Sequence, residues 1–155
     1  MKETERLIGL DFGTKTIGVA VSDALGVSAH PVGEIRRTSA ARDLDAVAGY
    51  VEEYEARGVV IGLPRNMNGT LGPAAEKVLA FVERLRSRLD VSVETWDERL
   101  TTAEAERVLI EADLSRKRRR EVIDRMAAVL ILQGWLDRRR MREAKTESPP
   151  KREES

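Results

Sequence analysis

The hydrophobic and polar positions at the start of the chain follow a strand-like pattern. Three short apolar runs rich in β-branched residues occupy 6–12, 16–23 and 27–36. The first two are joined by Gly-Thr-Lys at 13–15, which has the residue types of a tight turn, so they predict a β-hairpin. The third run contains Pro31, which cannot donate a ladder hydrogen bond and therefore favours the edge of a sheet.

From residue 39 onward, helical and strand-like patterns alternate. Apolar residues at helical spacing predict a helix over 39–57 with Ser39 as its N-cap, and a second helix beginning at Pro73. Apolar runs at 59–63 and 91–96 predict buried strands. The inward stripe of the second helix is expected to consist of Ala74, Val78, Phe81, Val82 and Leu85.

The last third of the chain predicts two helices and a polar tail. Thr101 and Glu104 have the spacing of a capping box for a helix that ends near residue 112. A long helix is expected over 117–140, and the polar, proline-containing residues 146–155 predict a disordered tail.

The resulting order, βββαβαβαα, predicts one α/β domain over residues 1–145. An antiparallel hairpin followed by strand–helix units gives a mixed five-stranded sheet with helices on both faces. No apolar run approaches the length of a membrane span, and the N-terminus lacks the pattern of a signal peptide, so a cytoplasmic protein without a membrane partner is expected. The absence of cysteine excludes disulfides and thiolate metal sites.

A net charge of zero hides an uneven distribution along the chain. Residues 1–115 contain 14 Lys/Arg and 20 Asp/Glu, a net charge of −6, whereas residues 116–145 contain 11 and 4, a net charge of +7. This suits a polyanion bound beside an acidic site. Charge alone favours a simpler explanation, namely that such runs are solvated helix faces.

Carboxylates stand at three places that could meet in the fold. Asp11 ends the first strand, Asp97 and Glu98 end the last, and Asp124 lies at the inner edge of the apolar stripe of the final helix. Singly, each is explained as a turn former, a cap or a partner of the helix dipole. Together they would raise one another's pKa and destabilise the fold unless a divalent cation that prefers oxygen ligands, Mg²⁺ or Mn²⁺, neutralised them.

Such an acidic site can hydrolyse phosphodiesters without a protein nucleophile. Two metal ions roughly 4 Å apart can activate water and stabilise the leaving oxygen. The single histidine, His30, next to Pro31, is expected to be structural or exposed. The residues therefore predict a metal-dependent endonuclease, with a non-catalytic RNA-binding protein as the alternative.

Four sequence blocks resemble the YqgF/RuvX family of the RNase H-like superfamily, which includes the Holliday-junction resolvase RuvC. They are GLDFGTKTIGVAVSD, VVIGLPRNMNGTLGPAAEKV, WDERLTTAEAERVL and RRREVIDRMAAVLILQGWLD. The resemblance implies an RNase H-like fold and a hydrolase that cuts structured nucleic acid. Processing of pre-16S rRNA in ribosome biogenesis is the preferred function. The alternatives are a Holliday-junction resolvase that acts on branched DNA and a non-catalytic RNA-binding ribosome-assembly factor. By position it implies Asp11, Glu98 and Asp124 as catalytic and metal-binding residues, with Asp97 in reserve.

The chain departs from the related patterns at two points. RuvC-type resolvases have an acid where Leu63, Pro64 and Arg65 stand here, which implies a site with a single tightly bound metal. Lys15 is followed by Thr16 where the family often has Arg, so one phosphate contact is expected to be missing. The glycine-containing hairpin also resembles the phosphate loop of actin-like ATPases, but a single domain of this length cannot close over a nucleotide.

Basic and amide side chains near the acidic positions are the candidates for contacts with nucleic acid. With aromatic residues at only 4%, recognition of shape and backbone is expected rather than base stacking. A monomer is favoured, because the sequence contains no clear dimer face. The candidates are Lys15, Arg65, Asn66, Asn68, Arg99, Arg116, Lys117, Arg118, Arg119 and Arg120.

Overall fold

The computed structural model describes the backbone of residues 6–147, and their side chains except at 101–104 and 146–147. The elements follow the predicted order: β1 (Leu7–Phe12), β2 (Thr16–Ser22), β3 (Ala29–Arg36), α1 (Ala40–Glu53), β4 (Gly58–Leu63), α2 (Pro73–Arg88), β5 (Ser92–Asp97), α3 (Glu98–Glu111) and α4 (Arg116–Glu147).

The five strands form one mixed sheet in the order β3-β2-β1-β4-β5. The β1–β2 and β2–β3 pairs are antiparallel, whereas β1–β4 and β4–β5 are parallel. β3 is at the edge, as Pro31 predicted. Because β1, β4 and β5 run in the same direction, their carboxyl ends lie at the same end of the sheet, where the chain leaves the core.

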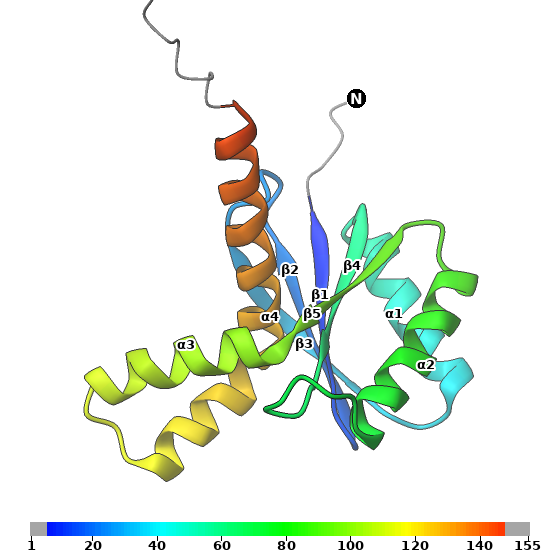
Figure 1. The fold of residues 1–155 in the computed structure, drawn as a ribbon. Helices are drawn as coiled ribbons and strands as arrows, with labels where there is room; N and C mark the ends of the chain where they lie inside the picture. Colours follow the sequence, from blue (N-terminus) through cyan, green and yellow to red (C-terminus); the bar gives the residue numbers. More distant parts are fainter. Residues whose placement is uncertain (1–5, 148–155) are drawn as a thin grey trace, which may run out of the picture.

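Two apolar cores lie on opposite faces of the sheet. α1 and α2 cover one face and α4 crosses the other (Figure 1). β4 is buried along its whole length because it feeds both cores: Val59 and Ile61 belong to the core under α1 and α2, and Val60 to the core under α4. The predicted mixed sheet with helices on both faces is confirmed.

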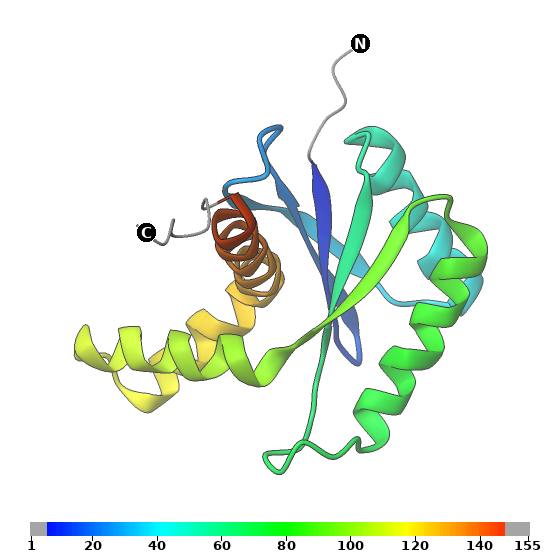
Figure 2. The ribbon, with the colours of Figure 1, turned by 45° about the horizontal axis from the view of Figure 1, so that its top comes forward.

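The α3–α4 hairpin stands partly apart from this layered body. α3 and the first turns of α4 run beside each other away from the sheet, and the rest of α4 lies along the sheet (Figure 2). Arg119, on α4, ties the two helices together, because its Nε donates to Glu106 Oε2 on α3 at 3.0 Å. None of the helices in the described part of the chain has the length and apolar character needed to cross a membrane.

Glycine allows α4 to lie directly on β1. A Cβ added at Gly9 would stand 2.7 Å from Leu132 Cβ and 3.0 Å from the Ala128 carbonyl oxygen, both on α4. We expect Gly9→Ala to push the helix off the sheet and to lower the free energy of unfolding by about 2 kcal/mol, the usual cost of overpacking. Urea denaturation measures this loss.

Gly49 provides the matched control for that substitution. It is exposed within α1, and an added Cβ there meets nothing within 4 Å. Gly49→Ala is therefore expected to stabilise the protein by about 0.5–1 kcal/mol through the better helix propensity of alanine. Equal effects of the two substitutions would contradict the close packing of α4 on β1.

Several predicted boundaries differ from the structure. Ser39 is the N-cap of α1 as expected, but the helix ends at Glu53, and Glu55 follows with a positive φ of 51°. The buried residue in the first turn of α2 is Ala75, whereas Ala74 is exposed, so the predicted stripe was wrong by one position.

The predicted capping box was also wrong. α3 starts directly after β5, with the Asp97 side chain accepting from the backbone N–H of Arg99, so Thr101 lies inside the helix. α4 extends to Glu147, two residues beyond the predicted domain boundary. Residues 148–155 of the predicted tail lie outside the described residues.

Candidate functional site

The three predicted acidic residues line one hollow of about 350 Å³ at the end of the sheet where β1, β4 and β5 have their carboxyl ends. Asp11 lies near the end of β1, Glu98 is the first residue of α3 directly after β5, and Asp124 is an exposed residue of α4. The other residues that line the hollow are Glu106, Arg120, Ile123, Ala127, Leu130 and Ile131.

Two glycines make room for these carboxylates. A Cβ at Gly62 of β4 would collide with Glu98 Oε1 and would lie 2.5 Å from Ile131 Cδ1. The Glu98 side chain therefore lies over the end of β4. Gly18, which pairs with Asp11 in the β1–β2 ladder, lies between Asp11 and α4: an added Cβ would be 3.6 Å from Asp11 Cβ and 3.5 Å from Ala128 Cβ.

Burial and mutual repulsion disfavour the charged forms of two of the acids. Burial, and then the charge of Asp124, raise the pKa of Asp11. Burial, and then the charges of Asp11 and Asp97, raise the pKa of Glu98 to about 7. The hollow therefore concentrates negative charge in a partly desolvated place, which attracts a cation or a proton.

The carboxylates of the hollow offer only oxygen atoms as metal ligands, which suits Mg²⁺ or Mn²⁺, but they do not surround an ion on all sides. In the described part of the chain, no group of three or more His, Cys, Asp or Glu side chains is close enough to hold a metal ion by itself. Mg²⁺ usually binds one or two carboxylates, keeps several waters and completes its shell with substrate phosphate. The residues thus fit a water-rich site completed by substrate. The charge of Asp124 raises the pKa of Asp11, and the charge of Asp11 raises the pKa of Glu98.

The Asp97 carboxylate forms an ion pair with Arg99. The Arg99 Nη2 donates to Asp97 Oδ2 at 2.7 Å, and its backbone N–H donates to Asp97 Oδ1 at 3.0 Å. These hydrogen bonds, first of all those of the guanidinium, lower the pKa of Asp97. Asp97 thereby caps α3 and fixes the point at which Glu98 enters the hollow.

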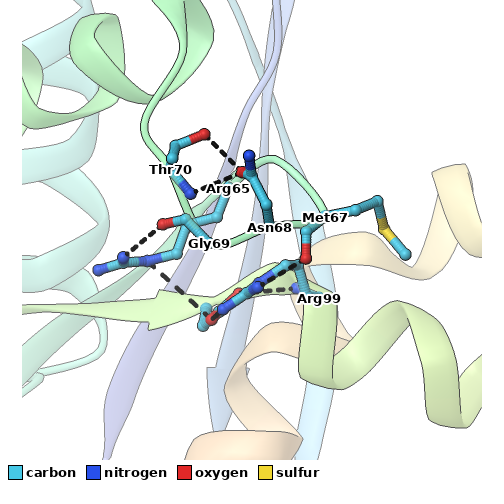
Figure 3. Close-up of polar contacts among 7 residues, drawn as sticks. Arg65, Met67, Asn68, Gly69, Thr70 and Arg99 are labelled. Carbon is cyan, nitrogen blue, oxygen red and sulfur yellow. Dashed lines mark hydrogen bonds and ion pairs between the residues drawn. The ribbon is translucent and has the colours of Figure 1, made fainter.

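The same pair fastens the loop after β4 (Figure 3). Arg99 Nη1 donates to the Met67 carbonyl at 3.2 Å, Arg65 Nη1 donates to the Gly69 carbonyl at 3.1 Å, and Arg65 Nε lies 4.0 Å from Asp97 Oδ2. Asn68 Oδ1 accepts from the Thr70 hydroxyl and backbone N–H. The loop is therefore an internally bonded turn anchored beside Glu98.

Four residues in or next to that loop that were predicted to contact nucleic acid, Arg65, Asn66, Asn68 and Arg99, thus hold the structure of the loop. Asn66 Nδ2 donates to the Thr70 hydroxyl at 3.0 Å, and Asn68 accepts within the same turn. Arg65 and Arg99 still expose 37% and 34% of their side chains, so part of each guanidinium faces solvent.

The predicted basic segment divides into two parts. Arg119 exposes only 16% of its side chain and is paired with Glu106, so it joins α3 to α4. Arg116, Lys117 and Arg118 are exposed at the start of α4, and Arg120 lines the hollow. Lys15 is exposed in the turn between β1 and β2.

Glu106 is the acidic residue of the hollow that the sequence reasoning missed. It lies eight residues after Glu98, a separation that places both near the same face of a helix. That signal was hidden because the helix was predicted to begin at Thr101, so Glu98 was assigned to the end of a strand.

Comparisons with known proteins identify the family of the chain. The sequence profile of the family RuvX, described as Holliday junction resolvase, matches residues 5–138. A "Putative pre-16S rRNA nuclease" of Myxococcus xanthus is 57% identical over 135 residues, which cover 87% of this chain and 89% of the relative. A protein of the same name from Desulforamulus reducens is 51% identical over 132 residues, covering 85% and 96%.

The fold is also that of a solved resolvase. T. thermophilus RuvC in complex with a Holliday junction substrate superimposes with a TM-score of 0.59 at 17% identity, covering 88% of this chain and 95% of RuvC. A second T. thermophilus RuvC structure gives a TM-score of 0.56 at 16% identity, covering 88% and 96%. The profile match and the identities of 50% or more, over most of both chains, show that this chain belongs to the RuvX family.

Proposed function

We propose that the chain is a divalent-metal-dependent nuclease that processes pre-16S rRNA. The observation that carries the proposal is the single hollow that brings Asp11, Glu98 and Asp124 together beside Arg120. The names of its RuvX relatives support the rRNA substrate. Cleavage of branched DNA is the second candidate, supported by the description of the family and by the likeness to RuvC.

The residues of the hollow have distinct tasks in hydrolysis. A bound Mg²⁺ or Mn²⁺ would supply Lewis-acid charge and lower the pKa of water. Asp11, at the end of a strand buried in the sheet, and Glu98, fixed by the cap of α3, would hold the ion through carboxylate oxygens. Arg120 lies on the same wall as Asp124 and suits an oxygen of the scissile phosphate.

In this proposal Asp124 takes up the proton of the attacking water. Its carboxylate is exposed and faces the hollow. The water oxygen bonds to phosphorus, the water proton passes to the carboxylate, and the bond from phosphorus to the leaving ribose oxygen breaks. Solvent then returns a proton to the leaving oxygen.

One experiment separates the candidate substrates. The purified protein, with Mg²⁺ or Mn²⁺, is given a pre-16S rRNA fragment and a four-way DNA junction in parallel, with EDTA as the blank. Metal-dependent cleavage of the rRNA fragment alone is expected. Preferential cutting of the junction by a dimer would favour resolution, because symmetric cutting of two strands requires two active sites.

The exposed basic residues at the start of α4 should determine how affinity depends on salt. Replacing Arg116, Lys117 and Arg118 together by Gln is expected to weaken RNA binding and to reduce the slope of log affinity against log salt by about 2–3, since each phosphate contact contributes about 0.7–0.9. Fluorescence anisotropy at several KCl concentrations measures this slope.

The control removes the same charge from the opposite face of the sheet. Arg42 on α1 and Lys77 and Arg84 on α2 are also exposed, and their replacement by Gln should leave the slope unchanged. If both triple variants lowered the slope equally, RNA would be attracted by overall charge and not by the start of α4.

A further inference from the structure

Large apolar side chains that face solvent gather in one groove along α3 and α4. Of the nine large hydrophobic side chains exposed in the described residues, five line it: Met67, Leu100, Val108, Met126 and Met141. The groove encloses about 1730 Å³, well above the roughly 300–1,000 Å³ of small-molecule pockets. Exposed apolar patches with a polar rim commonly mark binding surfaces for macromolecules.

The rim of this α3–α4 groove is predominantly basic. Six cationic side chains line it against two acidic ones, Glu98 and Asp137, an excess of four positive charges. Arg65 and Arg99 are engaged with Asp97 at one end of the groove. The other four cationic residues lie along α3 and the last turns of α4: Arg107, Arg138, Arg142 and Lys145.

We propose that the α3–α4 groove binds an amphipathic helix of a partner protein, with an apolar stripe flanked by acidic residues. The aliphatic floor would bury the stripe, and the three methionines can adapt to its shape. The basic rim would pair with the acidic flanks, so that charge complementarity selects the partner. A helix seated in an apolar groove is a recurrent mode of peptide recognition.

Other occupants suit this groove less well. A sugar–phosphate backbone is polar and would leave the exposed aliphatic floor of the groove without an apolar partner. A second copy placed face to face would bring two basic rims together. Residues 148–155, Ser-Pro-Pro-Lys-Arg-Glu-Glu-Ser, contain no large aliphatic side chain to fill the floor.

The test uses the full chain and a designed probe. The probe is a fluorescein-labelled helical peptide of about five turns, with Leu at i, i+3, i+4 and i+7 positions and Glu on both flanks. We expect anisotropy to report binding that weakens as salt rises. Val108→Gln combined with Met141→Gln should reduce affinity at least about tenfold; these side chains are 58% and 64% exposed, so the fold should tolerate the changes.

Matched controls keep the outcome decisive. Leu25→Gln removes a side chain that is 79% exposed outside the groove, and it should leave peptide affinity unchanged. Arg138→Glu on the rim should weaken binding, whereas Arg84→Glu on α2 should not. Equal binding of a sequence-scrambled peptide, or full affinity of the double variant, would overturn the proposal.

Two further measurements address the other occupants. The Val108→Gln/Met141→Gln variant could lose affinity for single-stranded RNA while it kept its affinity for the peptide. The groove would then be a binding site for nucleic acid. If sedimentation showed a dimer that the same variant dissociates, the groove would be a contact between copies. Either result would refute the peptide proposal. The inference is independent of the nuclease assignment. A chain that bound the peptide without cutting RNA would support the peptide site and contradict the nuclease assignment.

Discussion

Asp11→Asn is expected to abolish metal-dependent cleavage, with a loss of at least about 10²–10³-fold, while the protein remains folded. The substitution keeps the shape of the side chain and removes the charge that would hold the cation. Burial and Asp124 raise the pKa of Asp11, so its ionised form is disfavoured in the native state. The free energy of unfolding in EDTA at neutral pH should therefore stay the same or rise.

The sign of this effect follows from proton binding. Above the ordinary pKa of an aspartate, the unfolded chain has already lost this proton, whereas the native state tends to retain it; stability therefore falls as the pH rises through that range. Asp90→Asn, in the exposed loop before β5, removes an equal charge far from the hollow and should change neither activity nor this pH dependence. Full activity of Asp11→Asn would refute the nuclease proposal and leave the RNA-binding assembly factor.

Glu98→Gln should likewise abolish cleavage and should also flatten the pH dependence of stability between about pH 4.5 and 7. The pKa of Glu98 rises from 4.5 to about 7 on folding, so the wild-type protein loses stability across this window as the pH increases. At 1.36 kcal/mol per pKa unit, the upper limit of the loss is about 3–4 kcal/mol, and solvent screening at a partly exposed site reduces it. Urea denaturation in EDTA at several pH values measures it.

A second readout follows from the competition between a proton and a cation at Glu98. Binding of the metal requires the ionised carboxylate, so the Mn²⁺ affinity of the wild-type protein should rise as the pH increases through about 7 and level off above that pH. Calorimetric titration of Mn²⁺ would detect this trend, which Glu98→Gln should remove. Glu94→Gln, an exposed change on the same strand, is the control. A stability profile of Glu98→Gln that parallels that of the wild type would show that Glu98 does not titrate in the hollow.

The order of elements could be predicted because it depends on local patterns. Apolar runs rich in β-branched residues define β1 and β2, and the continuous run of β4 reflects burial on both faces. Ser39 marks a helix start through the hydrogen bond that its side chain accepts, and Pro73 through its fixed φ. Asp11 and Glu98 were also found in this way, because a charged residue at the end of a buried strand is visible in the sequence. Asp124 was found as a charged residue beside the apolar stripe of the last helix, whereas Glu106 was missed.

What the sequence determined by itself was therefore the succession of strands and helices, and the choice of Asp11, Glu98 and Asp124 as candidates. Tertiary structure alone decided how these acids combine: Gly62 leaves the space that Glu98 fills, and Asp97 is neutralised by Arg99 and starts α3 earlier than a capping-box pattern indicated. The groove along α3 and α4 is also a tertiary feature. The reason is physical, because capping and periodicity act within a few residues, whereas close approach, desolvation and charge coupling depend on segments that are distant in the chain.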